Sequence, residues 1–107
     1  MANVYTNAKV DLTTTSITTL YTAPALTTSI VSSIIVSEDS GNADTVTLTL
    51  TNSASAVFSL FKTKSISANA TTELLTAPLV LQTGEVLKAT AATANRLHVV
   101  ASILEIT

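Results

Sequence analysis

The stretch DTVTLTLTN, residues 44 to 52, alternates apolar and polar side chains without interruption. Successive side chains of a β-strand point to opposite faces, so this period of two predicts a strand with one face in a core. The apolar face consists of Val46, Leu48 and Leu50. The opposite face consists only of threonine, at Thr45, Thr47, Thr49 and Thr51.

The same character extends along the chain. Threonine accounts for 21 of the 107 residues, and β-branched side chains pack well on a pleated surface but are crowded in a helix. Turn-forming residues, including both glycines and both prolines, separate the apolar stretches. Predicted strands cover residues 4–10, 16–22, 29–37, 45–52, 56–64, 70–75, 79–81, 85–92 and 96–106. About eight short strands in a chain of this length predict an all-β, single-domain antiparallel β-sandwich.

A short internal sequence repeat favours a jelly-roll-like form of the sandwich. The residues LYTAP at 20–24 return as LLTAP at 74–78, about half the chain later. A jelly roll is built from two Greek-key halves, which would produce such a repeat. The segment 85–106 is also rich in alanine and leucine and could form a helix. Two strands fit an otherwise all-β domain better than this helix does.

The chain carries few charges. Charged residues make up 11% of it, against roughly 25% in a typical soluble domain. The basic residues occur singly, so we expect no nucleic-acid partner. No apolar stretch approaches the roughly 20 residues of a membrane-spanning helix, and the N-terminus lacks the pattern of a secretory signal. We therefore expect no membrane partner and synthesis in the cytoplasm.

Candidates for chemistry are also few. Residues 37–44, SEDSGNAD, place Glu38, Asp39 and Asp44 in one turn, and carboxylates of this kind can bind Ca²⁺. The spacing does not match a calcium loop, and a plain solvated turn uses the same residue types. His98 is the only histidine, and no motif supplies it with a partner for catalysis. The chain has no cysteine, nucleophile motif or phosphate-binding loop. We expect no enzyme activity, metal, cofactor or small-molecule substrate.

Aromatic side chains are scarce and tryptophan is absent. Sugar-binding sites commonly use exposed aromatic rings, so a carbohydrate-binding function is disfavoured. In a chain with so few rings, we expect Tyr21, Phe58 and Phe61 to lie in the core.

The uncharged surface indicates contact with other subunits. Burying a hydroxyl group that can form hydrogen bonds costs far less than burying a charge, and interface cores are depleted in lysine and glutamate. We expect the threonine face to lie in such an interface. Residues 1–15 are predicted to form an N-terminal arm that binds a partner, ahead of a sandwich domain at residues 16–107. The expected anchors of the arm are Val4, Tyr5, Val10 and Leu12.

Four segments carry a resemblance to a known group of proteins. They are TTLYTAPALTTSIVSSIIVSEDSGNADTVTLTLTN at 18–52, SISANATTELL at 65–75, LVLQTGEVLKATAAT at 79–93 and LHVVASILEI at 97–106. Their order resembles that of the small β-sandwich virion structural proteins of tailed bacteriophages, including marine cyanophages. The matching elements are turns and core positions, so the resemblance implies a jelly-roll-like fold and a viral setting without indicating a site.

Within such families, members serve as capsid decoration or cement proteins, as tail, neck or baseplate parts, and as fibre modules. A small chain with broad uncharged faces and no shaft repeat fits the first role best. We therefore expect a homo-oligomer, with a trimer favoured, on the capsid surface of a virion and bound to the major capsid protein. A tail, neck, baseplate or fibre subunit is the alternative, and copy number distinguishes it. A host-glycan-binding module is a third interpretation.

Overall fold

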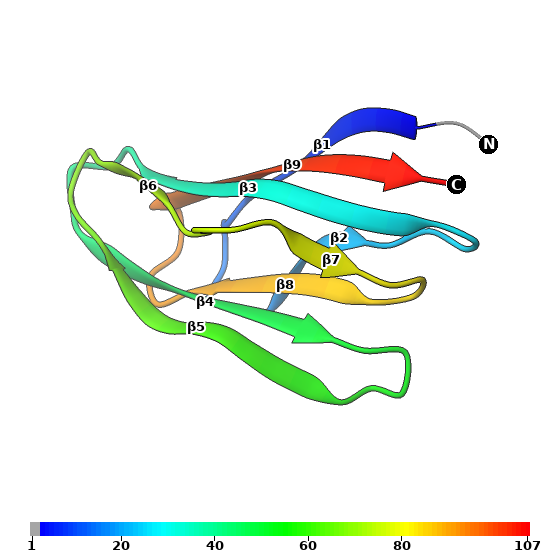
Figure 1. Cartoon of the computed structure of the whole chain (residues 1–107). Coiled ribbons are helices and arrows are strands. Elements are labelled where there is room, and N and C mark those ends of the chain that lie inside the picture. Colours follow the sequence, from blue (N-terminus) through cyan, green and yellow to red (C-terminus); the bar gives the residue numbers. More distant parts are fainter. Residues whose placement is uncertain (1–2) are drawn as a thin grey trace.

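The computed structural model describes residues 3–107, which form nine strands in two antiparallel sheets (Figure 1). The strands are β1 (Asn3–Asp11), β2 (Thr18–Thr22), β3 (Thr28–Glu38), β4 (Asp44–Thr51), β5 (Val57–Ile66), β6 (Thr71–Glu73), β7 (Leu79–Leu81), β8 (Val86–Ala91) and β9 (Leu97–Ile106). Sheet A has the order β1-β9-β3-β6, with β7 also paired to β3, and sheet B has the order β2-β8-β4-β5. None of these residues belongs to a helix of the length and apolarity that crossing a membrane requires.

The chain passes from one sheet to the other at almost every connection. Only β4 to β5 and β6 to β7 stay within a sheet. Because β6 and β7 pair with separate parts of β3, they act as one interrupted strand and leave four strand positions in each sheet. This winding is the jelly-roll arrangement, so the predicted fold class is confirmed.

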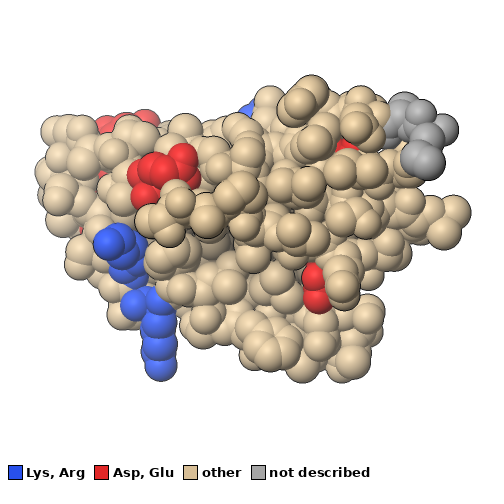
Figure 2. All heavy atoms as spheres, in the orientation of Figure 1, with Lys and Arg blue, Asp and Glu red and all other residues tan. Residues whose placement is uncertain are grey.

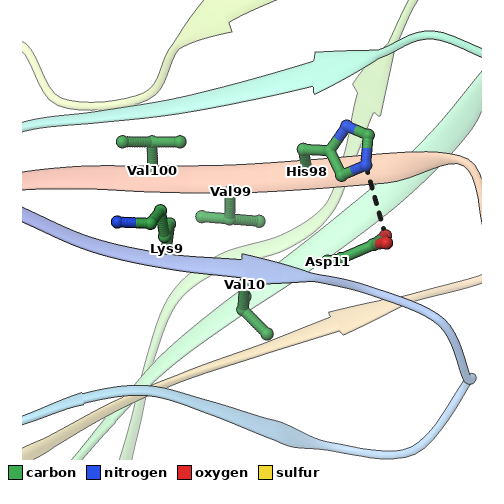
Figure 3. A pocket seen from close by; sticks show the side chains of 6 residues that line it. All are labelled: Lys9, Val10, Asp11, His98, Val99 and Val100. Carbon is green, nitrogen blue, oxygen red and sulfur yellow. Dashed lines mark ion pairs between the residues drawn. The ribbon is translucent and has the colours of Figure 1, made fainter.

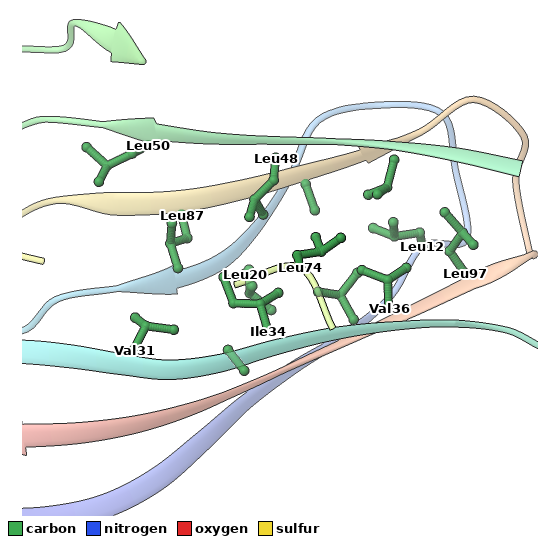
Figure 4. Packing of buried hydrophobic residues seen from close by; sticks show 14 of the residues in the cluster. Leu12, Leu20, Val31, Ile34, Val36, Leu48, Leu50, Leu74, Leu87 and Leu97 are labelled. Carbon is green, nitrogen blue, oxygen red and sulfur yellow. The ribbon is translucent and has the colours of Figure 1, made fainter. Parts of the chain in front are cut away.

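Period-two patterning explains how the two sheets enclose one core. In β4, Val46, Leu48 and Leu50 are buried and face sheet A, while the threonines between them are half-buried on the outer face. Figure 4 shows side chains from both sheets meeting between the layers. Strands β3, β8 and β9 supply further large core groups, with one irregularity in β3 between Val31 and Ser33: Val31, Ile34, Val36, Leu87, Leu97, Val99 and Ile103.

The predicted strands agree closely with the observed ones, and the helical alternative for residues 85–106 does not occur, since β8 and β9 occupy that segment. The prediction for the aromatic residues is partly wrong. Tyr21 and Phe61 pack against the core, but the ring of Phe58 is exposed. Phe58 lies opposite the inward-facing Leu50, yet β5 is an edge strand of sheet B, and the side chain remains 53% exposed.

Residues 3–11 of the segment predicted as an arm form β1, which pairs with β9 along its whole length. Residues 1 and 2 lie outside the described residues. Leu12 then turns into the core, where its side chain is fully buried, and its backbone N–H donates to the carbonyl of Leu97 at 3.0 Å. Within this chain the segment is therefore an edge strand of sheet A.

The gap between β6 and β7 is closed by one carboxylate. Glu73 accepts hydrogen bonds from the backbone N–H groups of Ile34 at 2.9 Å and Leu75 at 3.2 Å, and from the hydroxyl of Ser33. Burial tends to raise the pKa of Glu73, but these donors outweigh it and hold the pKa below its usual range. The side chain thus supplies the acceptors that a continuous strand would have offered to β3.

Candidate interaction surface

The acidic turn after β3 differs from the solvated turn that the sequence predicted. Glu38 is buried, and its carboxylate accepts from the N–H groups of Ser40 at 2.8 Å, Gly41 at 3.1 Å and Asn69 at 3.0 Å, and from the Ser40 hydroxyl. Burial tends to raise the pKa of Glu38, but the hydrogen bonds lower it to about 2. Both oxygens are used to fix the turn, because buried backbone donors require acceptors.

This carboxylate makes the fold sensitive to acid. The pKa of Glu38 falls on folding from 4.5 to about 2, so its contribution to stability is complete above about pH 5 and disappears as the pH falls toward about 2. We expect the Tm of the protein to drop over this range. The variant Glu38→Gln should melt several degrees lower at neutral pH and show a flatter acid limb, because an amide offers only one acceptor atom. Circular dichroism melts from pH 7 to about 2.5 measure this. Parallel acid limbs for the two proteins would contradict it.

His98 lies on the outer face of sheet A between two carboxylates. Its Nε2 is 3.3 Å from Oδ1 of Asp11, and its Nδ1 is 3.5 Å from Oδ2 of Asp39. Lys9 and Val100 border a shallow hollow of about 300 Å³ beside it (Figure 3). Among residues 3–107, no group of three or more His, Cys, Asp or Glu side chains is arranged to hold a metal ion. The cluster links the end of β1 to the turn after β3.

The threonine face lies on the outside of sheet B. All four of its side chains are half-buried there by their neighbours on β8 and β5. Thr47 has an internal role, since its hydroxyl accepts from the N–H of Thr63 at 3.1 Å, where β5 departs from regular pairing. Thr49 lies opposite Lys88, and Thr51 carries a buried hydroxyl oxygen that has no hydrogen-bond partner among residues 3–107.

The predicted anchors on residues 1–15 lie on the other sheet and do not form one group. Val4 and Tyr5 are exposed near the start of β1, and Val10 packs partly against the core. Leu12 is a correction to the sequence-based prediction, because its side chain is enclosed by the core of its own chain and cannot reach a partner. The structure therefore separates the threonine face from the anchors of β1.

A row of apolar side chains crosses the outer face of sheet A at one end. Tyr5 lies opposite Leu104, Leu104 opposite Ile30, and Ile30 opposite Val80, in strands β1, β9, β3 and β7. Tyr5 is 85% exposed and Val80 is 54% exposed. The end of β4, the start of β5 and the β2–β3 turn lie at this same end of the molecule (Figure 1). We call its apolar side chains the apolar end: Val4, Tyr5, Leu26, Ile30, Val57, Phe58, Val80 and Leu104.

Leu26 is the most exposed of the large apolar side chains in the described chain, at 90%. It also has a φ of 56°, in the left-handed region where a bulky side chain is disfavoured by roughly 1–2 kcal/mol. Glycine or asparagine would relieve this strain, and a polar residue would suit the solvent. A leucine that is both strained and exposed points to a function outside the folded chain.

Positive charges lie mostly away from the apolar end on the face that Figure 2 shows. Figure 2 shows lysine and arginine over the other half of the molecule, with only small acidic areas toward the apolar end. The carboxylates at this end are bonded within the chain: Glu85 accepts from the N–H of Gln82 at 2.8 Å, and Glu105 accepts from the hydroxyl of Tyr21. Burial, followed by the bond to Glu105, raises the pKa of Tyr21 to about 12, so its hydroxyl stays protonated. An exposed apolar surface with internally bonded charges suits contact with a protein.

Comparisons with known proteins do not identify a function for this chain. No protein-family model matches the chain, and no curated protein matches it at a significant level. Among solved structures, a chain in the structure of the infectious bursal disease virus Gt strain superposes with a TM-score of 0.48 and 10% sequence identity. The superposition covers 98% of this chain and 30% of that chain. This chain therefore spans about a third of the length of its structural neighbour.

Proposed function

We propose that this chain is a non-enzymatic structural protein of a bacteriophage virion, a decoration or cement protein that binds the outer shell and stabilises the head. The observation that carries the proposal is the apolar end, and above all Leu26, whose strained and exposed side chain destabilises the isolated chain. The jelly-roll fold is compatible with this role, because viral capsid domains use it, although lectins and enzymes use it too.

The apolar end attaches the protein to its partner, which is the major capsid protein. Removing several exposed apolar side chains from water supplies the favourable free energy. The nearby carboxylates of Glu85 and Glu105 already accept hydrogen bonds from their own chain. Three copies gather around a local three-fold position of the shell and cover the seams between capsid subunits. Many such contacts on one particle stabilise it by mass action.

The thermal release of the genome tests this function. Heads that lack the protein should open at a lower temperature than complete heads, and adding the purified protein back should restore the higher temperature. Dye access to the packaged DNA during heating measures the opening. Equal opening temperatures with and without the protein would rule out a cementing role.

Copy number separates the alternatives. Hundreds of copies per particle agree with a shell protein, whereas a dozen or fewer indicate a tail, neck, baseplate or fibre subunit. Binding to host-surface glycans by the isolated protein, together with failure to bind heads, would indicate a glycan-binding module instead.

The threonine face remains a predicted interface, and Thr49→Glu tests it. A glutamate at this position faces Lys88 across the strand pair, so the fold should keep its stability. If a neighbouring subunit covers the face, the buried carboxylate should weaken loading onto heads about tenfold or more. Quantitative sedimentation of heads with the variant measures the change, with Thr49→Ser as the matched control. Unchanged loading of Thr49→Glu would exclude the face from the interface.

A further inference from the structure

Most edges of the two sheets carry features that prevent pairing with another chain. Strand β2 has five residues and a register shift, and β6 and β7 have three residues each. Strand β5 has two register shifts and carries Lys62 and Lys64. Short length, bulges and lysines are the common means by which proteins block edge-to-edge association.

Strand β1 is the exception among the edges of the described chain. It has nine residues, none of them proline, and its pairing with β9 is regular from Asn3 to Asp11. It ends the order of sheet A, so none of the described strands lies along one side of its backbone. Seven of its nine residues are exposed, and Lys9 is its only lysine. A long, regular and open edge is a template for another strand.

We propose that a second copy of this chain pairs antiparallel with β1, with the two-fold axis at Asn7, so that sheet A continues across two molecules. A symmetric register must place residues of equal parity opposite each other, because only then do the outer faces of both sheets lie on the same side. Centring the pair on Asn7 is the choice that brings all nine residues of both strands into pairing.

The side chains are complementary in this register. On the outer face, Tyr5 lies opposite Lys9 of the second copy, and Asn3 lies opposite Asp11 of the second copy. On the inner face, Val4 lies opposite Val10 of the second copy. An ammonium group beside an aromatic ring, an amide beside a carboxylate, and two valines are all favourable cross-strand pairs. No like charges face each other, and the only lysine of the edge has a partner.

The dimer would also carry two apolar ends for attachment to the shell, an inference that rests on the proposed function. Antiparallel pairing directs the two apolar ends away from each other, since both lie where β1 begins. One dimer therefore reaches two attachment points, and links a copy of one three-fold group to a copy of the next. Two linked contacts hold more strongly than either one alone.

Cysteine cross-linking of the isolated protein tests the pairing, because the natural chain has no cysteine. Asn7→Cys places two sulfurs across the two-fold axis, where the Cα atoms of opposed residues are about 4.5–5.5 Å apart and a disulfide can form. Mild oxidation should yield disulfide-linked dimer at least about tenfold above the yield from Ser65→Cys, an exposed position on edge strand β5. Tyr5→Cys alone should not cross-link, since its two copies would be about 13 Å apart along the strands.

Light scattering of the natural chain provides the second measurement. The mass should rise with concentration from 11.0 kDa toward twice that value. A monomer at every concentration, or Asn7→Cys cross-linking no better than Ser65→Cys, would overturn the proposal. Neither measurement involves the head. A negative result would therefore rule out the dimer without affecting the proposed attachment through the apolar end, which the head-binding experiments test.

Discussion

Leu26→Asn should weaken binding of the protein to heads about 30-fold without destabilising its fold. Burying a leucine side chain in a contact is worth roughly 1.5–3 kcal/mol, and about 2 kcal/mol corresponds to that factor. The fold should be at least as stable as before, because asparagine tolerates the left-handed backbone that Leu26 adopts at a φ of 56°. Titration of heads with labelled protein measures the affinity, and thermal unfolding measures the stability.

The control for this variant is Ile17→Asn. Ile17 is exposed like Leu26, but it precedes β2, whose far end at Thr22 adjoins the apolar end. We expect binding of this control to heads to change less than about twofold, since it leaves the contact intact. Equal losses from both variants would show that the binding responds to general surface hydrophobicity. A Leu26→Asn variant with undiminished affinity would contradict attachment through the β2–β3 turn.

Leu48→Ala should lower the free energy of unfolding by about 2–5 kcal/mol, a large part of the roughly 5–15 kcal/mol available to a small domain. Leu48 is fully buried at the centre of sheet B, between Ala89 of β8 and Phe61 of β5. Its truncation leaves a cavity that strands held in register cannot close. Urea unfolding followed by circular dichroism measures the loss.

Ser59→Ala is the matched control for the core variant, because Ser59 is exposed on β5 and lies opposite Thr49. Its effect should stay within about 0.5 kcal/mol. If Leu48→Ala costs less than about 1 kcal/mol, the two sheets do not pack around the residues identified as the core.

The sequence predicted the fold well where the pattern is local. In β4 the alternation of Val46, Leu48 and Leu50 with threonine is a property of neighbouring residues, and it indicated both the strand and its buried face. Phe58 was misplaced because its exposure depends on β5 lying at the edge of sheet B. Leu12 was expected at an interface but is buried, because the pairing of β1 with β9 brings it into the core of its own chain.

The candidate surface was only partly predictable. Val4 and Tyr5 were expected at an interface and are exposed at the apolar end, but that they serve there stays a prediction. The contribution of Leu26 depends on its backbone angle, which the sequence does not display. The row from Tyr5 to Val80 joins four strands that are distant in the chain, and only their registers reveal it. A search for apolar residues beside turn signals, as in APAL at 23–26, could have identified Leu26.

Single-particle imaging of the intact virion tests the central claim most directly, because it shows which part of this chain faces its neighbours. The account predicts that Leu26, Tyr5 and Phe58 are buried against the capsid shell. An image in which the apolar end points into solvent, while another face holds the protein on the particle, would contradict it.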